Sequence, residues 1–145
     1  STLHTNDAVS AIVRLEDMGV EPYLVANSLV GVVAQRLVRT ICPKCKEEVP
    51  AKASDKIAVG EDIKKVSIGK GCPYCNNKGR IAVHEIILID STVRRMISRK
   101  AEIDEIKEYL NLEQGLETLQ DQAVQLVKDG ITTVAELNKI KVYSD

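Results

Sequence analysis

The first part of the chain carries apolar residues at helical spacing. Between Asn6 and Met18 the apolar positions cluster on one face of a helix with a period near 3.6 residues. Gly19 follows directly, and glycine readily adopts the left-handed conformation that ends many helices. We therefore predict a first helix over residues 6–18.

A longer apolar run extends from Tyr23 to Ile41 with few polar interruptions. Pro22 precedes it, at a position that suits the first turn of a helix. Gly31 costs a helix about 1 kcal/mol relative to Ala, but small residues of this kind let another backbone approach closely. The run predicts a second helix, deeply packed, over residues 23–41.

The C-terminal half begins with an extended segment and continues with helical patterns. Residues 80–88 are rich in Ile and Val and follow a glycine, which predicts a short strand. Asp90 or Ser91 can cap the next helix, and Thr133 with Glu136 forms a possible capping box for the last one. Two helices are predicted over residues 91–99 and 101–110. A third is predicted from an apolar stripe that ends at Gly130, and a fourth after Thr133.

Composition narrows the fold class. Aromatic residues make up 3% of the 145 residues, and Trp and Phe are absent, so Leu, Ile, Val and Ala must form the core. Together with the helical patterns, this predicts a mainly α fold with a few short strands.

The formal net charge is -1, which gives no general attraction to nucleic acid or to an anionic membrane. No apolar run approaches the roughly 20 residues of a membrane span, so we expect a soluble, unexported, cytoplasmic protein without membrane insertion.

Four cysteines form the strongest chemical signal. They occur as Cys42-Pro43-Lys44-Cys45 and Cys72-Pro73-Tyr74-Cys75, two C-P-x-C turns separated by 26 residues. Each such turn can direct two sulfurs to one point, so the pair supplies the tetrahedral thiolate set that Zn²⁺ prefers. A site closed by four thiolates has no position for an activated water, so the predicted zinc is structural.

Other interpretations of the cysteines remain open at this point. Two disulfides fit a reducing compartment less well than a metal site does, and four unrelated buried thiols fit the paired spacing less well. A rubredoxin-like iron site uses the same ligands, because thiolates alone do not identify the metal. A nucleic-acid zinc ribbon would need a basic face and stacking aromatics, whereas Tyr74 is the aromatic residue near these turns.

The two histidines differ in context. His84 falls within the predicted strand, and because four cysteines already complete a site, we predict that it is a packing residue. His4 lies in a polar segment before the first helix. The residues that follow it, Thr5, Asn6 and Asp7, can cap that helix through their side-chain oxygens.

Several segments in order along the chain resemble the type II secretion and type IV pilus assembly ATPases, the GspE/PilB family. These segments are STLHTNDA, VAQRLVRTICPKC, GCPYC, GRIAVHEIILID and DGITTVAEL. The resemblance implies that His4 corresponds to a histidine that senses or positions the terminal phosphate of the nucleotide. It also implies a phosphate-side or packing role for Arg36, and a tetracysteine zinc-binding subdomain that docks to the inner-membrane machinery.

The same resemblance implies an organisation and a set of partners. Residues 1–41 would end the nucleotide-binding core of a RecA-like P-loop ATPase, 42–79 would form the zinc subdomain, and 80–145 a strand with a helical C-terminal subdomain. The parent would be a homo-hexamer that uses ATP and Mg²⁺ to power pilin or pseudopilin assembly, at inner-membrane platform proteins and without a nucleic-acid partner. This chain contains no G-x-x-x-x-G-K-[ST] loop, so we expect it to be inactive alone. The alternative is a free-standing structural-zinc adaptor that docks to a protein partner.

Overall fold

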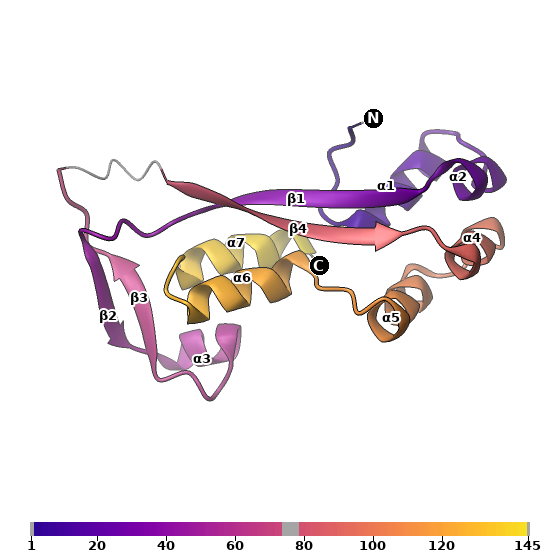
Figure 1. Cartoon of the computed structure of the whole chain (residues 1–145). Helices are drawn as coiled ribbons and strands as arrows, with labels where there is room; N and C mark the ends of the chain where they lie inside the picture. The colour runs from indigo at the N-terminus through magenta and orange to yellow at the C-terminus, as the bar shows by residue number, and fades with distance from the viewer. Residues whose placement is uncertain (1, 74–78, 145) are drawn as a thin grey trace. The chain divides into compact units, whose positions relative to one another are not determined.

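The computed structural model describes residues 2–73 and 79–144, which contain seven helices and four strands (Figure 1). In chain order these are α1 (Ala8–Asp17), α2 (Pro22–Ser28), β1 (Gly31–Arg39), β2 (Lys46–Pro50), α3 (Ala53–Val59), β3 (Lys65–Gly69), β4 (Arg80–Leu88), α4 (Ser91–Ser98), α5 (Ile103–Glu113), α6 (Leu119–Lys128) and α7 (Val134–Ser144). None of the helices in these ranges is both long enough and apolar enough to cross a membrane. The fold is therefore mixed, with helices and two small sheets.

The residues divide into two compact units, each built from two separate stretches of chain. The first unit comprises Ser1–Gln35 and His84–Thr118, and the second comprises Arg36–Val83 and Leu119–Asp145. Strands β1 and β4 each pass from one unit into the other. The compact units are defined by contacts within the chain, and the three consecutive functional segments that the sequence suggested stay a prediction.

The prediction of one helix over residues 23–41 is wrong. Helix α2 ends at Ser28, and the rest of the run is the nine-residue strand β1. Burial alternates along this strand: Ala34 and Val38 are buried, whereas Val33 and Leu37 are each 60% exposed. Alternation with a period of two, in a segment rich in valine, is typical of a strand with one covered face.

Strand β1 pairs with β4, as predicted for residues 80–88. The Ile89 amide donates to the Val30 carbonyl at 3.0 Å, and the Thr40 amide donates to the Gly79 carbonyl at 2.9 Å. The residue numbers of the partners decrease along β4 as they increase along β1, so the two strands are antiparallel. A partner more than 40 residues away in sequence has therefore decided the conformation of β1.

Helix α1 confirms the first predicted helix and packs within the first unit. The Asp7 carboxylate caps it by accepting the Ser10 amide at 2.7 Å, and Gly19 follows with a φ of 94°. Helix α1 contacts α2 and α5, and α2 contacts α4. The buried side chains of these helices are Ala8, Val9, Ala11, Ile12, Val25, Ala26, Val93, Ile97, Ile106 and Leu110.

A hydrogen-bonded cluster joins the end of β4 to the following helices of the first unit. Asp90 caps α4, as predicted, by accepting the Val93 amide at 2.8 Å, and it also accepts the Tyr109 hydroxyl at 2.7 Å. The Gln114 amide group bonds both the N–H (3.1 Å) and the C=O (2.9 Å) of Leu88. Burial raises the pKa of the Asp90 carboxyl, but hydrogen bonds from Val93, Tyr109 and other donors outweigh it and leave the pKa below its ordinary value.

The second unit contains elements that the sequence did not predict. Strands β2 and β3 pair antiparallel from Lys46↔Gly69 to Pro50↔Lys65, and α3 lies between them in the chain. Helices α6 and α7 pack side by side, and both contact α3 (Figure 1). The core includes Val66, Leu119 and Leu137, which are all at most 5% exposed. Helix α3 and strand β3, which lie between the two cysteine pairs in the chain, thus pack against helices of the second unit.

The turn before α7 is bonded to the chain around the end of β1, within the second unit. The fully buried Thr132 donates its hydroxyl to the Arg39 carbonyl at 2.6 Å, and the Ile41 amide donates to the Ile131 carbonyl at 2.8 Å. Thr133 accepts the Glu136 amide at 3.3 Å, so that half of the predicted capping box is present. The Glu136 carboxylate instead accepts the Arg39 amide at 3.1 Å. These bonds fix the chain immediately before the first cysteine.

Candidate functional site

The strand register brings the cysteine-bearing turns together. Cys42 and Cys45 lie between β1 and β2, and Cys72 follows β3. Lys46 pairs with Gly69, and the ladder extends one step further because the Lys70 amide donates to the Cys45 carbonyl at 3.1 Å. The antiparallel pair therefore places both turns at the same end of the ribbon.

The sulfur positions fit a metal site. The Sγ atoms of Cys42, Cys45 and Cys72 all lie within 4.8 Å of one another, and those of Cys42 and Cys72 are 3.9 Å apart. A tetrahedral zinc with bonds of about 2.3 Å places its sulfurs about 3.8 Å apart, whereas a disulfide needs about 2.05 Å. All three cysteines are half-buried, and none of them is joined to another by a disulfide. Cys75 lies outside the described residues, so its role as the fourth ligand stays a prediction.

Backbone amides stabilise negative charge on the first of these sulfurs. The amide of Lys44 lowers the pKa of the Cys42 thiol; burial opposes this, and the Cys45 amide adds to it. The turn itself is closed by a bond from the Cys45 amide to the Cys42 carbonyl at 3.3 Å. Gly71, with a φ of 87°, provides the left-handed turn just before Cys72. The first turn thus favours the thiolate form of Cys42, which is the form that binds a metal.

This donor set would hold Zn²⁺ or iron, since soft thiolates bind both. Such an ion would cross-link the turn after β1 to the turn after β3. The three sulfurs supplied by the described residues belong to one unit. The arrangement can stabilise a structure, and with a fourth thiolate it would leave no position for a reacting water.

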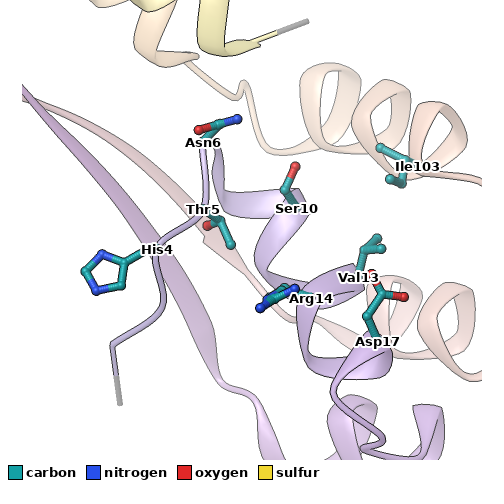
Figure 2. Close-up of a pocket in the computed structure, with 8 residues that line it drawn as sticks. All are labelled: His4, Thr5, Asn6, Ser10, Val13, Arg14, Asp17 and Ile103. Carbon is teal, nitrogen blue, oxygen red and sulfur yellow. The ribbon is translucent and has the colours of Figure 1, made fainter.

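The segment around His4 lines a cavity of about 290 Å³ in the first unit. Figure 2 shows the His4 imidazole directed away from the helix that carries Ser10, Arg14 and Asp17. The His4 side chain is exposed, while the backbone that follows it is held by a bond from the Thr5 hydroxyl to the Asp7 carbonyl at 3.0 Å. The capping role predicted for this segment is confirmed at Asp7. The lining residues are His4, Thr5, Asn6, Ser10, Val13, Arg14, Asp17 and Ile103.

Two predicted positions are corrected by the structure. His84 is exposed on β4, so the prediction that it is a packing residue is wrong. Arg36 lies half-buried on strand β1 in the second unit, and not on a helix. Within the described residues, the metal-competent cluster contains cysteines only.

Glu85, a buried carboxylate in the first unit, was not predicted from the sequence. Glu85 is 4% exposed and lies between Val83 and Ile87, which point to the same covered face of β4. Its Oε2 atom accepts the backbone amide of Ala8, the first residue of α1, at 2.8 Å. The available signal was the register: residues 83, 85 and 87 share one face, so a charged residue there must have a buried partner.

Comparisons with known proteins cover almost the whole chain. The family described as "Type II/IV secretion system protein" matches residues 1–139. The chain is 38% identical to the type II secretion system ATPase E of Vibrio cholerae over 97% of its length, and 39% identical to the type IV pilus assembly ATPase PilB of Thermus thermophilus over 94%. It spans only 29% and 16% of these two relatives. On this evidence the chain belongs to the type II/IV secretion system protein family.

Proposed function

We propose that the chain is the C-terminal portion of an ATPase that powers pilin or pseudopilin assembly in type II secretion or type IV pilus biogenesis. The observation that carries the proposal is the family match over residues 1–139 together with the small share of each relative that the chain spans. The phosphate-binding loop, absent from this sequence, would lie elsewhere in the parent polypeptide. ATP and Mg²⁺ would bind in that parent, which would act as a hexamer.

In this proposal the histidine segment senses the nucleotide. The His4 imidazole is exposed and lies just before the N-terminal end of α1, where helix amides favour negative charge. A donor at this place can stabilise charge on a terminal phosphate that the rest of the nucleotide site holds. Arg36 would act on the phosphate side or support it, because guanidinium groups pair well with phosphates.

The zinc subdomain would serve assembly and not catalysis. Cys42, Cys45, Cys72 and Cys75 would hold a structural Zn²⁺, for which the spacing of the three described sulfurs is suitable. We propose that this subdomain, residues 42–79, docks on platform proteins at the cytoplasmic face of the inner membrane. Residues 1–41 would complete the nucleotide-binding core, and 80–145 would form the C-terminal subdomain.

The test uses the complete polypeptide encoded by the native gene. It should hydrolyse ATP, and His4→Ala should lower turnover by about a hundredfold, as loss of a donor to developing charge does, with little change in ATP affinity. His84→Ala is the matched control, because that histidine is exposed on β4 and should leave turnover unchanged. Unchanged turnover in His4→Ala would refute the sensor role. A gene product without a phosphate-binding loop and without hydrolysis would support the zinc adaptor instead.

A further inference from the structure

Glu85 is costly to bury, and its surroundings indicate what it does. Val83 and Ile87, on either side of it along the covered face of β4, are at most 2% exposed. An apolar residue would serve simple packing there, because an ionised carboxylate loses favourable hydration when buried. What Glu85 offers, and an apolar residue would not, is an acceptor for the Ala8 amide at 2.8 Å. Ala8 is fully buried, so this amide has no access to bulk water as a partner.

The entry to α1 is fixed from three elements of the first unit. The residue before α1, Asp7, accepts the amide of Ser10 within α1 at 2.7 Å. Helix α5 contributes Lys107, whose Nζ lies 3.5 Å from the Asp7 Oδ2. Strand β4 contributes Glu85, which bonds the next residue, Ala8. The contacts from β4 and α5 therefore act on adjacent residues, three and four positions after His4.

We propose that Glu85 is a positioning residue for His4. By holding the Ala8 amide, the Glu85 carboxylate fixes the direction in which the chain enters α1, and therefore where the preceding segment presents the His4 imidazole. Lys107 supports the same segment through its ion pair with Asp7. The Lys107 side chain is 42% exposed and the Asp7 side chain is 13% exposed, so this contact lies nearer to solvent than the Glu85 contact. This inference rests on the role proposed above for His4, because a positioning residue acts on turnover only through the residue that it positions.

A double-mutant cycle in the complete ATPase polypeptide tests the inference. Glu85→Gln keeps the shape and one acceptor oxygen but removes the charge, and charge-assisted bonds are roughly twice as strong as neutral ones. We expect kcat to fall about tenfold with KM for ATP within about twofold, as for loss of an interaction made in the transition state. In a His4→Ala background the same change should have no further effect on kcat, because coupled residues are not additive.

The control is Glu136→Gln, another carboxylate that accepts a backbone amide, at 3.1 Å from the Arg39 nitrogen in the second unit. It should leave kcat unchanged. If Glu85→Gln does not fold, judged by its melting curve, Lys107→Gln takes its place in the cycle, with an expected loss of about threefold in kcat that again disappears without His4.

The outcomes separate the two proposals. A loss in Glu85→Gln that is absent in the His4→Ala background supports the positioning role. Losses that multiply, or an unchanged kcat in Glu85→Gln while His4→Ala is impaired, overturn the positioning role alone. An unimpaired His4→Ala overturns the proposed function of His4 and the positioning role with it.

Discussion

Replacing Cys72 with Ser should remove the metal and destabilise the second unit. A metal that joins Cys42 to Cys72 closes a loop of about 30 residues, and the chain entropy of such a closure is worth about 3.7 kcal/mol at 25 °C. Structural zinc in small peptides contributes more, about 10–16 kcal/mol, because those peptides are unfolded without it. Here the β2–β3 ladder and buried side chains such as Val66 remain when the ion leaves. We therefore expect a loss near the loop-closure value.

A loss of that size corresponds to a fall in Tm of about 10 °C for a chain of this length. The assay is elemental analysis of protein purified without added metal, together with thermal unfolding followed by circular dichroism. The unaltered chain should contain about one zinc ion, and Cys72→Ser should contain almost none. Finding iron in place of zinc would favour the rubredoxin-like redox interpretation.

The matched control is Lys70→Ala, which changes the same end of the ribbon without touching a ligand. Lys70 forms an ion pair with Glu47 at 2.8 Å, but both side chains are well exposed, so the pair is worth about 0–1 kcal/mol. This variant should keep its zinc and nearly all of its stability. A Cys72→Ser protein with a full zinc content and an unchanged Tm would refute the ligand assignment.

Two further predictions concern stability. Asp90→Ala should cost about 2 kcal/mol through loss of the α4 cap and of the Tyr109 bond. Hydrogen bonds leave the Asp90 pKa below its ordinary value, so the ionised carboxylate stabilises the folded chain. In urea titrations, the difference in the free energy of unfolding between Asp90→Ala and the unaltered chain should be complete above about pH 4 and shrink as pH falls through the lowered pKa. A difference independent of pH would contradict this. Thr132→Val should cost about 1–2 kcal/mol, since it leaves the Arg39 carbonyl without its 2.6 Å donor, and an unchanged urea midpoint would show that the bond contributes nothing.

Local signals predicted local structure well. Asp7, Gly19 and Asp90 act within a few residues of themselves, and the structure shows the cap or turn expected at each. Cysteine spacing is likewise a local signal, because a C-x-x-C turn directs its own sulfurs, and three of the four predicted ligands lie together. The placement of Cys75 and the three consecutive functional segments stay predictions.

The sequence-based predictions were wrong where residues distant in sequence determine the local conformation or burial. Strand β1 has an apolar run that also suits a helix, and its extended form depends on pairing with β4. The segments β2, α3 and β3 are only five to seven residues long, so their own pattern is weak; α3 packs against both α6 and α7, and β3 packs against α6. Glu85 and His84 are neighbours with opposite exposure, and only the register of β4 tells which one faces inward.

The discontinuous make-up of the two units limits how the chain can be cut. An expression fragment that stops at Thr118 keeps every residue of the first unit but deprives the second of α6 and α7. A fragment of residues 36–83 alone carries the cysteines described here yet exposes Val66, which the unit otherwise buries. A chimera that transplants the cysteine ribbon into another scaffold would therefore need a new linker that joins residues 36–83 to 119–145, in place of a single excision.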